Sequence, residues 1–356
     1  MTRSRPAERP GPVLPFAGLV RPAAGFAALL AAAALITALV GTGLTEPATV
    51  VGIEPVPAVV RLGIPVARVL LDLGAVAAAG LALLSKMVGF DDPGATEPVL
   101  RRARPIAAWA SLLWTAAALL SVLLLAWEIS AATGDGFPSA GQIWAYVGNV
   151  PAGKGLLLSA ACGLISFWLC RLSVRHGEKV PAELRVGIVL FGLLPLPLTG
   201  HASNWYWHDV AMISMELHVV AATAWAGGLG ALLIFLIRRP ALLAIALPRF
   251  SRLATWCVLL VGLTGLFNGL VELALSPITS LPESLWQTRY GVLLLAKIIC
   301  MAAIAVTAVV VRTRLLPQVA AGRPSAIALW CGWELLVLAI AFGVAVVLTR
   351  APVSPF

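Results

Sequence analysis

Residues 210–237 read VAMISMELHVVAATAWAGGLGALLIFLI, an apolar run in which Glu216 is the one Asp, Glu, Lys or Arg. A helix needs about 20 such residues to cross the hydrocarbon core of a bilayer. Charge marks both ends of the run, because Asp209 precedes it and Arg238 and Arg239 follow it. We therefore predict a membrane-spanning helix over this stretch.

Eight further runs of the same kind bring the predicted number of spans to nine. They cover roughly residues 22–43, 58–84, 105–131, 152–170, 186–200, 253–274, 290–311 and 326–349. Pro195 and Pro197 interrupt the short run at 186–200, which makes it the least regular. Hydrophobic residues make up 60% of the 356 positions and charged residues 12%, a balance that a water-soluble surface does not accommodate. The sequence predicts an all-α, polytopic transmembrane helical bundle within a lipid bilayer.

Basic residues are concentrated in every second connection between the predicted helices. The clusters are Arg3, Arg5 and Arg9; Lys86, Arg101, Arg102 and Arg104; Arg171, Arg175, Lys179 and Arg185; Arg238, Arg239, Arg249 and Arg252; and Arg312, Arg314 and Arg323. The intervening connections at 44–57, 132–151, 201–209 and 275–289 contain one basic residue, Arg289. Because Lys and Arg accumulate in cytoplasmic loops, we predict a cytoplasmic N-terminus and an extracytoplasmic C-terminus. The residues responsible for the net charge of +9 therefore lie in loops that set the orientation in the membrane, and no nucleic-acid partner is expected.

The predicted organisation has three parts. Residues 1–21 form a basic tail without the cleavage site of a signal peptide, residues 22–185 form N-terminal transmembrane helices, and residues 186–356 form a second transmembrane domain. The connection at 85–104 is expected to be the longest charged loop. All five cysteines lie inside apolar runs without a Cys-x-x-Cys pair, so no disulfide framework is expected.

Four residues at one end of the 210–237 run share a helical stripe. His208, Met212, Met215 and His218 are spaced +4, +3 and +3, which keeps their side chains on one face. Imidazoles and thioethers are soft ligands that suit Cu(I). The stripe is open to two interpretations, a soft-metal ladder or a packing face on which the methionines fill gaps and His218 bonds a neighbouring helix.

His201, seven residues before His208, joins the same predicted outer end, whereas His176 lies among basic loop residues and is expected to be solvated. Glu216 is a candidate second-shell partner or proton acceptor beside the stripe. The small residues Gly227, Gly230 and Ala231 would let another helix approach closely.

Several other polar side chains fall inside predicted spans, where they pair or line a polar path. Arg68 and Asp72 are spaced i and i+4 and can neutralise each other. Lys297 and Glu334 are candidates for an interhelical ion pair or for a polar path that also includes Trp225. Structural pairing and a role in transport both stay open for these residues.

An ordered set of motifs, from about Gly200 to the C-terminus, resembles the membrane domain of the copper-resistance D (CopD) family, also found in YcnJ-type proteins. The matching pieces are Gly200-His201-Ala202, Leu217-His218-Val219, Ala224-Trp225-Ala226-Gly227-Gly228, Arg249-Phe250-Ser251-Arg252-Leu253-Ala254, Thr264-Gly265-Leu266, Thr288-Arg289-Tyr290-Gly291 through Lys297, and Trp333-Glu334. The resemblance implies copper uptake across a bacterial cytoplasmic membrane, or copper supply to cuproenzyme assembly. It also implies partners such as an extracytoplasmic copper chaperone or a cytochrome oxidase assembly factor.

Three functional hypotheses follow. The leading one is a copper transporter in which His201 and His208 meet the ion outside and pass it to Met212, Met215 and His218. The second is a membrane cytochrome that holds haem b between His201 and His218. The third is a scaffold that binds copper and delivers it to a partner. An enzyme is not expected, because no Gly-x-Ser-x-Gly, His-Glu-x-x-His or phosphate-binding Gly-rich motif is present.

Overall fold

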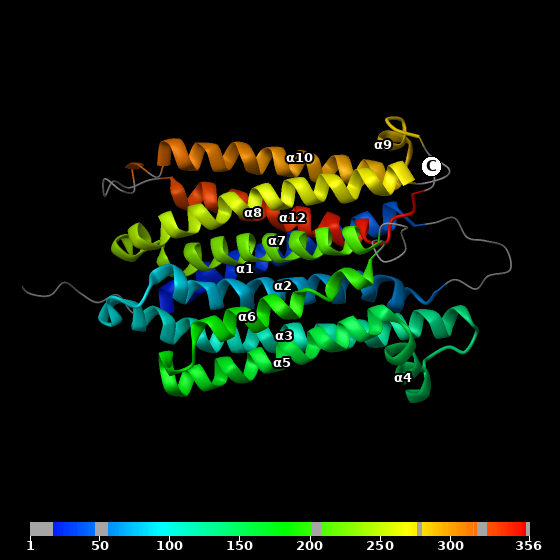
Figure 1. Cartoon of the computed structure of the whole chain (residues 1–356), viewed down its shortest axis with the longest axis horizontal. Coiled ribbons are helices and arrows are strands. Elements are labelled where there is room, and N and C mark those ends of the chain that lie inside the picture. Colours follow the sequence, from blue (N-terminus) through cyan, green and yellow to red (C-terminus); the bar gives the residue numbers. More distant parts are fainter. Residues whose placement is uncertain are drawn as a thin grey trace, which may run out of the picture.

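The computed structural model describes residues 17–46, 56–200, 208–275, 280–315, 317–318 and 326–353. Within that part of the chain, nine helices are long and apolar enough to cross a membrane. The nine predicted spans and the all-α, polytopic bundle are therefore confirmed. Figure 1 shows the long helices running side by side along the longest axis of the molecule.

The long helices are α1 (Ala17–Leu44), α2 (Ala58–Val88), α3 (Pro93–Ala132), α5 (Pro151–His176), α6 (Ala182–Leu193), α7 (His208–Leu236), α8 (Pro240–Leu275), α10 (Arg289–Val310) and α12 (Ile327–Leu348). The short elements are α4 (Ala140–Asn149), α9 (Ser284–Gln287), the 3₁₀ helices η1 (Gly177–Lys179) and η2 (Leu196–Thr199), and the π-helix η4 (Val311–Leu315). α6 continues into η2 to make the short fifth span.

The predicted loop at 85–104 is wrong, because α2 runs to Val88 and α3 already begins at Pro93. The Asp92 side chain accepts a hydrogen bond from the Ala95 backbone N–H at 3.2 Å and so caps the start of α3. At 1.5 Å per residue the 40 residues of α3 span about 60 Å, roughly twice the hydrocarbon thickness. The first turns of α3 therefore project beyond the apolar layer. Their charged side chains can be solvated there while the backbone stays helical.

α4 lies in the connection at 132–151, where no helix was predicted. Its start is fixed by a capping box, in which Gln142 N–H donates to the Ser139 hydroxyl at 3.3 Å and Ser139 N–H donates to Gln142 Oε1 at 2.8 Å. The Ser-x-x-Gln spacing was a readable signal for this helix.

The predicted irregularity of the fifth span is confirmed. α6 stops at Leu193, and the chain continues through Pro195 and Pro197 as the 3₁₀ helix η2. Proline lacks a backbone N–H and so cannot continue the α-helical ladder. The break places Thr199 and Gly200 against other helices of the bundle.

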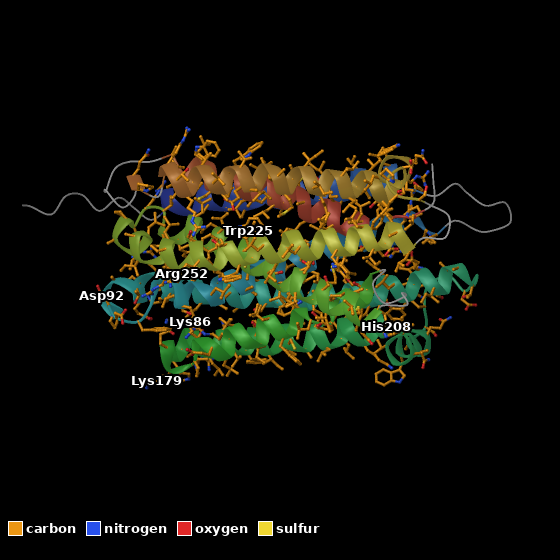
Figure 2. All side chains as sticks on the ribbon, turned by 45° about the horizontal axis from the view of Figure 1, so that its top comes forward. Lys86, Asp92, Lys179, His208, Trp225 and Arg252 are labelled. Atoms are coloured by element: carbon orange, nitrogen blue, oxygen red, sulfur yellow. The ribbon has the colours of Figure 1, made fainter. Side chains whose placement is uncertain are left out.

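The connections rich in basic residues lie at one end of the bundle. Figure 2 shows Lys86, Lys179 and Arg252 near one end, and His208 near the other. This arrangement agrees with the alternation found in the sequence. The assignment of the basic end to the cytoplasm stays a prediction.

The bundle closes through contacts between helices that are distant in sequence. α1 packs against α12, and α2 packs against α7. α2 and α7 approach backbone to backbone at Gly80 and Gly227, because a Cβ built on either glycine would overlap the backbone of the other helix. The predicted close approach at Gly227 is confirmed, whereas no described atom lies within reach of a Cβ at Gly230.

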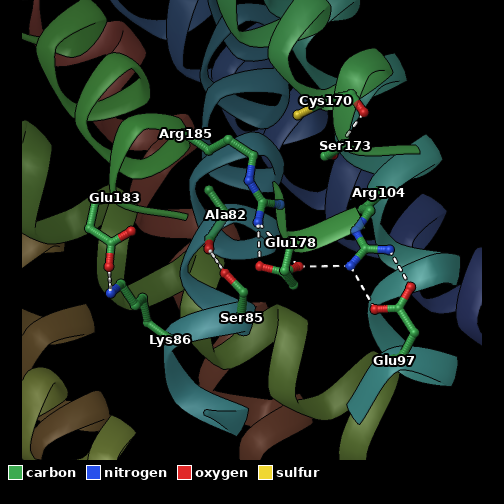
Figure 3. A network of polar contacts seen from close by, with 10 residues as sticks. All are labelled: Ala82, Ser85, Lys86, Glu97, Arg104, Cys170, Ser173, Glu178, Glu183 and Arg185. Carbon is green, nitrogen blue, oxygen red and sulfur yellow. Dashed lines mark hydrogen bonds and ion pairs between the residues drawn. The ribbon is translucent and has the colours of Figure 1, made fainter. Parts of the chain in front are cut away.

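An ion network ties α3, η1 and α6 together at the basic end (Figure 3). Arg104, only 3% exposed, donates to both oxygens of Glu97 at 2.6 and 2.8 Å and to Glu178 at 2.7 Å. Arg185, also buried, reaches the other oxygen of Glu178 at 3.2 Å. The carboxylate of Glu178 thus serves two buried guanidinium groups, which would otherwise be costly to bury.

Candidate functional site

A cavity of about 330 Å³ lies between α2, α7, α8, α10 and α12, with η2 at one end. Gly200 and Thr349 line it towards the end of the bundle that carries His208, and Trp225 and Met301 line it farther inside. Along α10 its walls run from Tyr290 to Met301, which corresponds to about 16 Å at 1.5 Å per residue. The cavity is therefore deep enough to form part of a path through the bilayer.

His218 is the described histidine that lines this cavity. Its Nδ1 lies 3.0 Å from the hydroxyl oxygen of Thr264 on α8. The Thr264 hydroxyl donates its own proton to the Leu260 carbonyl, so Thr264 is left to accept and His218 Nδ1 must carry the donated proton. This places the ring proton on Nδ1, and the Val261 carbonyl also accepts a hydrogen bond from the imidazole.

Space for the imidazole ring comes from Gly265. A Cβ built on Gly265 would lie 3.0 Å from His218 Cε1, closer than an ordinary contact. Thr264 therefore orients the His218 ring, and Gly265 leaves room for it.

Two thioethers line the same cavity as His218. Met215 lies one helical turn before His218 on α7, and Met301 comes from α10. No pattern in the sequence singles out Met301, because it is one methionine within an apolar run. One imidazole and two thioethers are a soft ligand set of the kind that Cu(I) prefers.

The predicted stripe is divided in the structure. Met215 and His218 line the cavity, but His208 and Met212 do not. The His208 side chain is 56% exposed and its Nε2 lies 3.0 Å from Asp209 Oδ1. His201 lies outside the described residues, and no group of three or more His, Cys, Asp or Glu side chains placed to hold a metal occurs among those described.

Asn268 adds a neutral polar group to the wall. Its Nδ2 donates to the Ser214 hydroxyl at 2.9 Å and to the Thr264 carbonyl at 2.7 Å. Its Oδ1 is buried and has no hydrogen-bond partner among the described residues. This oxygen is a further acceptor that a bound substrate could use, because buried polar groups normally have partners.

The charged residues that line the cavity differ in whether they form an ion pair. The i,i+4 pair of Arg68 and Asp72 is confirmed at 3.2 Å, and Arg68 also donates to the Thr199 hydroxyl at 2.6 Å. Lys297 lines the cavity but forms no ion pair within the part of the chain that the structure describes. Its amino group, when protonated, places a positive charge on the cavity wall.

The ion pair between Lys297 and Glu334 that the sequence left open is not formed. Glu334 accepts a hydrogen bond from the Trp225 indole N–H at 3.0 Å. This bond joins α7 to α12 beside the cavity. Glu216, the other predicted partner, lies on α7 but does not line the cavity, and all five cysteines are free thiols that likewise lie elsewhere.

Nine candidate membrane spans among the described residues, with an internal cavity that a histidine and two methionines help to line, are the architecture of a multi-pass membrane protein. The comparisons narrow this class. The family model for copper resistance protein D matches residues 244–348, and the model for the copper resistance protein D-like N-terminal domain matches residues 59–209. The chain belongs to the copper-resistance D family. No curated protein and no solved structure matches it.

The two matched regions meet at the cavity. Arg68 and Asp72 come from the N-terminal match, and Gly265, Asn268 and Lys297 come from the second. His218 and Met215 lie in the interval between them, on α7. The match to an N-terminal domain was not expected from the motifs, which begin near Gly200.

Proposed function

We propose that this protein carries copper across the bacterial cytoplasmic membrane in the direction of uptake, with the cavity as its binding site. The observation that carries the proposal is the position of His218, whose ring is held by Thr264 and which shares a cavity with Met215 and Met301. Membership of the copper-resistance D family supports copper as the substrate. Nothing in the sequence provides for ATP hydrolysis, so the copper gradient or a coupled ion would drive movement.

The direct test is copper accumulation by proteoliposomes. Vesicles that hold the purified protein and an internal Cu(I) chelator should accumulate copper faster than empty vesicles. Binding without accumulation would favour the delivery scaffold, a protein that hands copper to an extracytoplasmic chaperone or an oxidase assembly factor. Accumulation at the rate of empty vesicles together with no binding would contradict the proposal.

The haem b hypothesis makes a separate optical prediction. Among the described residues the cavity offers one axial nitrogen, that of His218, and the other candidate, His201, lies outside them. A haem protein purified with its cofactor has a Soret band and sharp bands on reduction. We expect the spectrum to lack these bands, and their presence at one haem per chain would displace the copper hypothesis.

Thr264→Val should weaken Cu(I) binding moderately. Valine keeps the shape but removes the acceptor that holds the Nδ1 proton of His218. A hydrogen bond contributes about 0.5–1.5 kcal/mol, so we expect affinity to fall between about twofold and tenfold. Chelator competition in detergent measures the change, and Thr264→Ser, which keeps the hydroxyl, serves as the matched control. Equal affinity in the valine and serine variants would argue against the assigned tautomer.

Lys297→Leu should tighten Cu(I) binding. At an effective dielectric constant near 20, two unit charges separated by the full cavity length of about 16 Å still repel by about 1 kcal/mol. Removing the ammonium group should therefore increase affinity by about fivefold or more, while Lys297→Arg, which keeps the charge, should change it little. Unchanged affinity in the leucine variant would contradict a charged Lys297 beside the ion.

A further inference from the structure

A second hollow lies on the outside of the bundle, on the N-terminal helices α3 and α5. It has a volume of about 420 Å³, and its walls are Ala108, Trp109, Phe167, Trp168, Arg171, Leu172 and Arg175. Trp109 and Trp168 are 69% and 60% exposed, and Phe167 meets Trp168 edge to face at 5.6 Å. We call these seven residues the α3–α5 groove. Its position on membrane-spanning helices means that lipid is its natural neighbour.

The groove is polar at one end and aromatic at the other. Arg175 lies in the last turn of α5, Arg171 one turn farther in, and Trp168 about 10 Å from Arg175 along the axis. A phospholipid shows the same order, with a charged headgroup at the surface and apolar chains below it. Tryptophan side chains are favoured at this level of a bilayer.

Both groove arginines are available to an anion. Within the described residues neither Arg171 nor Arg175 forms an ion pair, and both are exposed. Glu178, the next acidic residue along the chain, is already committed to Arg104 and Arg185 (Figure 3). The charge of the groove is therefore positive, and no acidic side chain among the described residues pairs with it.

We propose that the α3–α5 groove binds the headgroup of an anionic glycerophospholipid. Arg171 and Arg175 hold the phosphate, and Trp109 and Trp168 flank the upper part of the acyl chains. Guanidinium groups bind phosphate through two parallel hydrogen bonds, and basic pockets on the cytoplasmic side of membrane helices select anionic lipids. This site is separate from the copper cavity and does not depend on copper transport.

The test is native mass spectrometry of the full-length protein titrated with phosphatidylglycerol or phosphatidylcholine. The wild-type protein should retain phosphatidylglycerol at least about tenfold more tightly than phosphatidylcholine, given two arginine contacts near the surface. Arg171→Gln with Arg175→Gln should remove that preference. Arg171→Lys with Arg175→Lys should keep part of it, because a point charge remains.

A matched control removes two charges from the same end of the bundle. Arg238→Gln with Arg239→Gln lies between α7 and α8, away from the groove, and should leave the preference intact. Excess inorganic phosphate should not displace the lipid, and Trp168→Ala should weaken both lipids alike. The proposal is overturned if the groove double variant, shown by its melting temperature to be folded, keeps the wild-type preference, if the control loses it equally, or if free phosphate competes fully.

Discussion

His218→Ala should reduce the affinity for Cu(I) by at least about tenfold and slow copper uptake in proportion. The substitution removes the one imidazole nitrogen that the described part of the chain presents to the cavity, and leaves two thioethers. Loss of an outer partner of a metal ligand already costs about 10–100-fold, so loss of the ligand itself should cost no less. Chelator competition gives the affinity, and copper accumulation in vesicles gives the rate.

The matched control is His176→Ala, which removes an exposed imidazole in the last turn of α5. It should have no effect on either quantity. His201→Ala is also expected to weaken binding at least about tenfold if the outer end of the path contributes a ligand, as the motif Gly200-His201-Ala202 suggests. Wild-type affinity in the His218 variant would remove the basis of the proposed site.

Gly227→Leu should prevent the protein from folding into a stable bundle. A side chain at this position would have to enter the backbone of α2 at Val76 and Gly80, which cannot move aside as a flexible side chain could. Overpacking a tight core costs about 1–3 kcal/mol even where side chains can adjust, and a clash with backbone should exceed that range. We expect a large loss of monodisperse protein after extraction and a lower melting temperature in what remains.

Gly230→Ala, three residues farther along the same helix, is the control. A Cβ there meets no atom of the described residues within 4 Å, so the protein should extract and melt like the wild type, or slightly better. Similar losses in both variants would mean that helix flexibility, not the contact with α2, explains the effect at Gly227.

The number and type of helices could be predicted because a helix that spans a bilayer needs a long apolar run, and such runs are easily recognised in the sequence. The starts of α3 and α8 could not, because prolines and arginines such as Pro105 and Arg252 usually mark loops, yet here they lie in helical segments. α8 begins at Pro240, 13 residues before the predicted start at 253. The length of an apolar run reflects the thickness of the membrane, whereas the helix itself can extend beyond that run.

Prediction of the site was less complete. Helical periodicity placed Met215 and His218 on one face, and both line the cavity. The same periodicity included His208, but that residue is the first of α7 and lies exposed at the end of the bundle. Thr264 and Met301 come from α8 and α10, and no local pattern could indicate which residues of distant helices would face His218.

The walls of the cavity that His218 lines come from both family-matched regions, with Arg68 and Asp72 on one and Asn268 and Lys297 on the other. Neither region encloses the site by itself. A gene split between α6 and α7 would therefore yield two partial products, and only their reunion in the same membrane would restore the cavity.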